Sequence, residues 1–139
     1  GAAVAVLREE IQATVDSAAG MSGLAEHCTQ LKDALAQIEA TVKTVSEAAD
    51  PSLALANATI FLDAMGHVVI AWMWLKQAVA ATRGLQQGNA ADTAFYQGKL
   101  AATQFFFRYE LPKTDASLAL VAGLDSTCYD LSADQFTGS

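Results

Sequence analysis

Apolar residues recur at steps of three and four along most of this chain, which is the spacing of one helical face. The spacing is most regular between Leu24 and Val45, where it follows the heptad pattern of helices packed side by side. From Phe61 to Val79 the apolar residues cover most of the helix circumference, which predicts the central helix of a bundle. The pattern predicts main helices over about 3–19, 22–45, 51–83 and 93–110, and a short one over 116–124.

Proline and glycine mark the expected ends of these helices. Pro51 suits the first turn of the third helix, Gly84 follows its expected last residue, and Pro112 closes the fourth. Residues 125–139 have mixed composition and no clear period. Because the helices alternate with short connections, we expect an all-α fold: an antiparallel four-helix bundle with a short C-terminal extension, forming a single domain over residues 1–139.

Composition narrows the possible partners. Eight Lys and Arg against fifteen Asp and Glu give a net charge of -7, which leaves no basic stripe to neutralise phosphates. We therefore expect no nucleic-acid binding. The most apolar window, Ala64–Leu75, is shorter than the roughly twenty residues of a bilayer span. Arg8 and Glu9 interrupt the apolar start of the chain, so we expect neither a membrane span nor a signal peptide.

The two cysteines, Cys28 and Cys128, lie a hundred residues apart and outside any Cys-x-x-Cys pair. That spacing gives no support to a zinc site or a thioredoxin-like motif, and it leaves a disulfide open. Two isolated cysteines in a helical chain fit a reducing compartment, where a buried thiol packs as a small hydrophobic group. We expect a cytoplasmic protein.

One polar pair has the spacing of a catalytic dyad. His67 follows Asp63 by four residues, so the two side chains share a helical face and the carboxylate can orient the imidazole. The large apolar residues around them favour a different interpretation, in which His67 is a core-edge histidine satisfied by Asp63. Phosphotransfer through His67 is disfavoured because bulky residues follow it and the next lysine, Lys76, lies nine positions on.

Other motifs of chemistry are missing from the sequence. A di-iron bundle needs Glu-x-x-His pairs on two helices, and the chain has none. Glycine-rich nucleotide loops and Ser-His-Asp arrangements are also absent. We therefore expect no catalytic, cofactor-binding or metal-binding residues in this chain.

The aromatic residues point to a partner surface. Phe95, Tyr96, the run Phe105–Phe107 and Tyr109 form a wider set than one buried stripe usually hides, so part of it is expected to face a partner. Trp72 and Trp74 lie two positions apart and point to nearly opposite sides of a helix. Either one side of that helix meets something beyond its closest neighbour, or the helix is surrounded within the bundle.

Two segments, Asn57–Gln77 and Phe95–Pro112, resemble parts of a known module, the C-terminal domain of large bacterial acyl-CoA dehydrogenases. Asn57–Gln77 resembles the central helix of that domain, and Phe95–Pro112 resembles its last main helix. Together they cover under a third of the chain. The short chain and its start at Gly1 without a methionine suggest a domain excised from a larger flavoenzyme.

The resemblance implies an FAD-dependent parent that removes hydrogens from the α and β carbons of acyl-CoA thioesters. The flavin and the catalytic glutamate would belong to the preceding domains, so this fragment alone is expected to be inactive. Its partners would be the remaining domains and a second subunit. If the module also borders the acyl-CoA site, Arg83, Lys99 and Arg108 are candidates for phosphate contact; the alternative for these three is solvated surface charge. A stand-alone interaction or signalling bundle is the alternative function.

Overall fold

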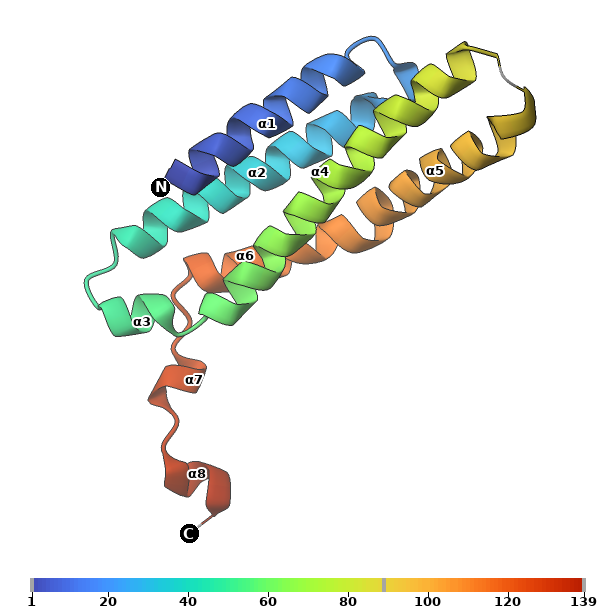
Figure 1. Cartoon of the computed structure of the whole chain (residues 1–139). Coiled ribbons are helices and arrows are strands. Elements are labelled where there is room, and N and C mark those ends of the chain that lie inside the picture. Colours follow the sequence, from blue (N-terminus) through green and yellow to red (C-terminus); the bar gives the residue numbers. More distant parts are fainter. Residues whose placement is uncertain (1, 89, 139) are drawn as a thin grey trace.

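The computed structural model describes residues 2–88 and 90–138, and within them all regular secondary structure is helical. Four long helices form an elongated bundle in which each runs antiparallel to the long helix before it (Figure 1). This confirms the expected all-α bundle. The long helices are α1 (Ala2–Ala18), α2 (Ala25–Ser46), α4 (Ala58–Gln86) and α5 (Thr93–Phe105). The shorter ones are η1 (Ser22–Leu24), α3 (Pro51–Leu55), η2 (Ala90–Asp92), η3 (Phe106–Glu110), η4 (Leu111–Lys113), α6 (Thr114–Ala122), α7 (Thr127–Asp130) and α8 (Ala133–Thr137).

Helix α4 is the centre of the bundle and packs against α1, α2, α5 and α6. Small side chains at Ala71 and Ala78, both fully buried, let the neighbouring helices approach closely. Trp72 donates its indole N–H to the Thr14 hydroxyl of α1 at 2.8 Å, whereas Trp74 lies beside Lys99 of α5. The two tryptophans therefore meet different neighbours, and α4 has bundle contacts on both of these sides.

The sequence predicts one helix that starts at Pro51, but in the structure this segment forms two helices. The chain forms α3, leaves the helix at Ala56 and Asn57, and then begins α4. The Asn57 side chain is buried and its amide donates to the Asp125 carbonyl at 2.9 Å. This tertiary hydrogen bond fixes the junction against the end of α6, and no local hydrophobic pattern reports it.

The sequence predicts that the third main helix ends before Gly84, and this prediction is wrong. Gly84 lies buried inside α4, which continues to Gln86. The ring of Tyr96 from α5 packs directly against its backbone, in the space that a Cβ atom would occupy. Glycine is present here because it allows a close approach between two helices.

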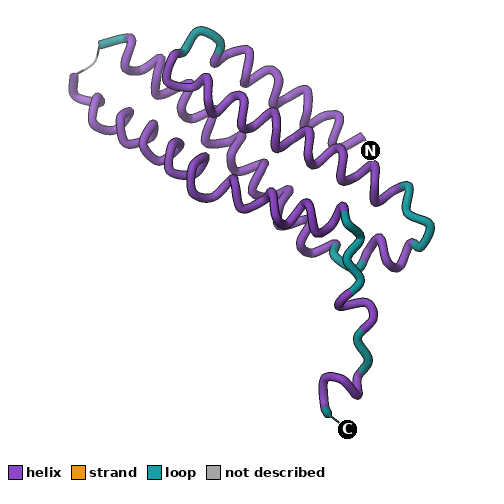
Figure 2. The backbone as a smooth tube through the Cα atoms, turned by 180° about the vertical axis from the view of Figure 1, so that it is seen from behind, coloured by secondary structure: helices purple, strands orange, loops and turns teal. Residues whose placement is uncertain are grey.

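Pro112 also fails to close the helical path. After α5 the backbone passes through the π-helical η3 and the 3-10 turn η4 and then enters α6, which packs against α2 and α4. Figures 1 and 2 show this as one bent helical arm. Pro112 lies in the first turn of η4, where its missing N–H costs little.

The C-terminal segment stands away from the bundle in both views (Figures 1 and 2). Its helices α7 and α8 are exposed throughout. The Tyr129 hydroxyl lies 3.4 Å from the Asp50 carboxylate and holds the start of the segment near α3. This matches the expected C-terminal extension.

Helix α4 is long and apolar enough to cross a bilayer by length and composition alone. It is much longer than the Ala64–Leu75 window because Asp63 and Lys76 lie within the same helix. In this structure α4 packs among the other helices, and a core helix of a soluble bundle passes the same test. The absence of a membrane span stays a prediction.

Candidate functional site: an apolar face on α4 and α5

The Asp63 and His67 pair has a different geometry from a catalytic dyad. The His67 Nδ1–H donates to the backbone carbonyl of Asp63 at 2.9 Å, while the Asp63 carboxylate lies 3.8 Å away and is largely exposed. The imidazole stacks on Phe106 with ring centroids 6.3 Å apart. The helix backbone and an aromatic ring thus orient His67 more closely than the carboxylate does.

The three cations proposed near acyl-CoA lie in different surroundings. Lys99 contacts α4, where its ammonium donates to the Gln77 amide oxygen at 3.1 Å. Arg108 contacts α2, with 3.5 Å between its guanidinium and the Glu26 carboxylate. Arg83 is exposed near the end of α4. Since Lys99 and Arg108 turn toward different helices, these two do not point at one shared phosphate site.

A buried histidine escaped the sequence analysis. His27 of α2 is only 4% exposed, its ring stacks on Phe107 at 4.7 Å, and its Nδ1 has no hydrogen-bond partner in the structure. The buried Oε1 of Gln30, one turn later, is also unpaired. The signal in the sequence was its spacing, because His27 lies three residues after Leu24 and four before Leu31, on the same helical side as both.

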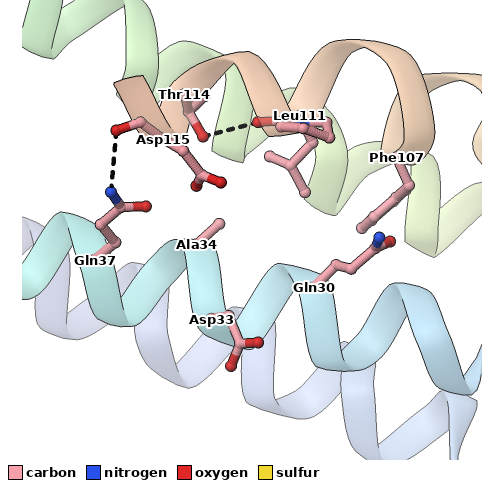
Figure 3. A pocket seen from close by; sticks show the side chains of 9 residues that line it. Gln30, Asp33, Ala34, Gln37, Phe107, Leu111, Thr114 and Asp115 are labelled. Carbon is pink, nitrogen blue, oxygen red and sulfur yellow. Dashed lines mark hydrogen bonds between the residues drawn. The ribbon is translucent and has the colours of Figure 1, made fainter. Parts of the chain in front are cut away.

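Figure 3 shows a hollow of about 200 Å³ between α2 and the η3–α6 arm. Gln30 and Phe107 lie at one end of it, and the Gln37 amide donates to the Asp115 carbonyl at the other, at 3.3 Å. Thr114 donates to the Leu111 carbonyl at 2.8 Å. The bond from Gln37 joins α2 to the arm, and the bond from Thr114 lies within the arm.

Metal and thiol chemistry receive little support in the part of the chain that the structure describes. Within residues 2–88 and 90–138, no three His, Cys, Asp or Glu residues gather closely enough to hold a metal ion. Both Cys28 and Cys128 are free. Burial raises the pKa of the Cys28 thiol, and the nearby charge of Lys32 opposes that shift.

Several large apolar side chains are exposed on α4 and α5. Helices α4 and α5 lie side by side (Figures 1 and 2), and large hydrophobic side chains of both remain uncovered. Leu62 is 65% exposed on α4, and Phe95 is 62% exposed on α5. Together with Lys99, which lies between the two helices, these residues make up what we term the outer face: Leu62, Ile70, Met73, Phe95, Lys99, Phe105 and Tyr109.

Helical periodicity places Leu62 and Met73 on one side of α4. Positions 62, 66, 69, 73, 77 and 80 form one stripe along this helix, and they hold Leu, Gly, Val, Met, Gln and Ala. The corresponding stripe of α5 and η3 holds Phe95, Lys99, Ala102 and Tyr109. Lys99 is the only charged residue at the positions of these two stripes. Exposed apolar side chains that gather on one side of a domain are a common mark of a contact surface.

Charge is distributed unevenly around the molecule. The α4–η3 hairpin, residues 58–110, contains four basic and three acidic residues, a net charge of +1. The remaining residues contain four basic and twelve acidic residues, a net charge of -8. The acidic part keeps the domain soluble, and the hairpin is the part on which an apolar contact meets the least charge repulsion.

The described part of the chain is an all-α helical bundle with exposed large apolar side chains on α4 and α5. A family model described as acetyl-CoA dehydrogenase C-terminal like matches residues 7–132, which is most of the chain. The chain belongs to this family, and the expected resemblance to acyl-CoA dehydrogenase C-terminal domains is confirmed. No curated protein and no solved structure matches the chain significantly.

Proposed function

We propose that this chain is an accessory C-terminal domain of an FAD-dependent acyl-CoA dehydrogenase, and that it contributes assembly surface to the enzyme. Family membership supports the type of parent protein. The observation that carries the assembly role is the outer face, because burying its large side chains against another protein removes them from water. The flavin, the acyl-CoA substrate and the catalytic base would be held by the other domains of the parent.

The occupant of the outer face is, in this proposal, the body of the same dehydrogenase. An interface between domains of one chain can be modest in area, because the linker raises the effective concentration of the two surfaces. The phosphate-contact role of Arg83, Lys99 and Arg108 is not part of the proposal, since Lys99 and Arg108 turn toward different helices.

The test uses the full-length enzyme with Met73→Glu, which places a carboxylate at the centre of the outer face, where Met73 is 52% exposed. The matched control is Val6→Glu, an exposed apolar residue of α1 on another side of the bundle. We expect Met73→Glu to lower the oligomer fraction in size-exclusion chromatography, or the flavin content, or acyl-CoA turnover. Val6→Glu should change none of these properties. Wild-type values for Met73→Glu in all three would contradict an assembly role.

A further inference from the structure

The partner of the outer face can be specified further from the surroundings of Lys99. Its ammonium lies 5.7 Å from the ring centre of Trp74 and 5.4 Å from that of Phe95, so both aromatic faces contact the cation. The side chain is half-buried, and one of its three donors reaches the neutral amide of Gln77. Among the described residues, no carboxylate lies within 4.0 Å of this ammonium.

The surroundings of Lys99 differ from those of the basic residues that form salt bridges. Arg8 pairs with Glu39, Arg108 with Glu26 and Lys113 with Glu110. Lys99 instead contacts two aromatic rings and a neutral amide, among the exposed apolar side chains of the outer face. When a partner covers that surface, the ammonium loses water and needs an anion, because an unpaired charge in an apolar interface is costly.

We infer that the outer face binds a surface of the dehydrogenase body that presents one Asp or Glu carboxylate within an apolar patch, and that this carboxylate pairs with Lys99. This inference rests on the proposed function. The carboxylate would complete the hydrogen bonds of the ammonium between the Trp74 and Phe95 rings. It would also fix the orientation of the docked domain, since apolar contact alone is poorly directional.

A second copy of the chain does not satisfy the same requirement. A two-fold interface places the same patch on both sides. The residues that define the outer face include no Asp or Glu, so a second outer face would offer Lys99 no carboxylate from within that set. The outer face is therefore complementary to a different surface, and we expect the isolated chain to be monomeric at high protein concentration.

The test measures binding of the purified chain to the dehydrogenase lacking these residues, by isothermal titration calorimetry at low and high salt. Lys99→Gln should weaken Kd about tenfold or more, because it leaves the partner carboxylate unpaired. Lys99→Arg keeps the charge and should recover most of the affinity. The matched control is Lys76→Gln, since Lys76 also lies over a tryptophan, at 4.9 Å from the Trp72 ring, but on the side that faces α1.

The outcomes separate this inference from the proposed function. If Met73→Glu abolishes binding while Lys99→Gln binds like wild type, the inferred pairing of Lys99 with a partner carboxylate is wrong, and the docking role of the outer face stands. If Met73→Glu also binds like wild type, the outer face is not the docking surface. A dimer of the isolated chain that Met73→Glu dissociates would overturn the inference. So would Lys99-dependent binding of free coenzyme A to the isolated chain, since the anion would then be a phosphate.

Discussion

Three consecutive phenylalanines near the end of α5 occupy three different surroundings. Phe107 is fully buried against the His27 ring, Phe106 is half-buried beside His67, and Phe105 is 54% exposed and stacks on Tyr109 at 4.8 Å. The change from α-helical to π-helical geometry begins between Phe105 and Phe106 and contributes to this spread. Neighbouring phenylalanines thus pack in the core in one case and lie on the outer face in another.

These surroundings predict losses of stability of different size for the same substitution. Phe107→Ala should lower the free energy of unfolding by about 3–5 kcal/mol, because it leaves a cavity in the core. Phe105→Ala removes only a surface stack and should cost under about 1 kcal/mol. Urea denaturation followed by circular dichroism measures both values. Equal losses for the two variants would contradict the assignment of Phe107 to the core.

The spacing of apolar residues predicted which apolar side chains of α2 are buried, but it did not predict the buried polar ones. Leu31, Leu35 and Ile38 are buried as their spacing predicts, but His27 and Thr41 are buried on the same helix. The Thr41 hydroxyl is satisfied by the Gln37 carbonyl at 2.8 Å, four residues earlier. A hydroxyl paired in this way can enter a core at little cost, and sequence patterns do not report the pairing.

At the scale of elements, the two glycines of α4 have different roles. Gly84 touches the Tyr96 ring, whereas nothing lies within 4 Å of the position that a Cβ atom would take at Gly66. The sequence predicted helix α4 but ended it at Gly84, because a glycine that allows close helix packing looks the same as one that ends a helix. Only the position of α5 separates the two cases.

A pair of alanine substitutions checks this distinction. Gly66→Ala should raise the free energy of unfolding by about 0.5–1 kcal/mol, because alanine favours the helix and meets no neighbour. Gly84→Ala should lower it by about 1–3 kcal/mol, because Tyr96 must move away. Thermal and urea unfolding of both variants gives the comparison. A stabilised Gly84→Ala variant would show that the α4–α5 contact is looser than described.

For the molecule as a whole, the sequence predicted the class of fold, and the presence of a partner surface stays a prediction. It did not predict which aromatic residues form that surface, because Trp72, Trp74 and Phe107 are covered by helices distant in sequence. It also treated Lys99 as one of three equivalent cations. The contacts of Lys99 with two aromatic rings depend on how α4 and α5 pack, which periodicity alone does not specify.

One core joins residues of α1, α2, α4, η3, η4 and α6, so the bundle should unfold in a single step. Trp72→Phe leaves Trp74 as a probe of the α4–α5 contact, and Trp74→Phe leaves Trp72 as a probe of the α4–α1 contact. The fluorescence of each variant in urea should follow its own circular dichroism signal. An earlier fluorescence change in Trp72→Phe alone would mean that α5 separates before the rest.

The unbroken helical path from α5 through η3 to α6 makes side-chain direction in α6 depend on the number of residues before it. Loss of one residue from η3 would turn α6 by about 100° around its axis. Leu118, fully buried now, would rotate out of the core. The connection between α2 and α3, residues 47–50, transmits no such rotation. Natural length changes in this family are therefore expected in connections of that kind and not in η3.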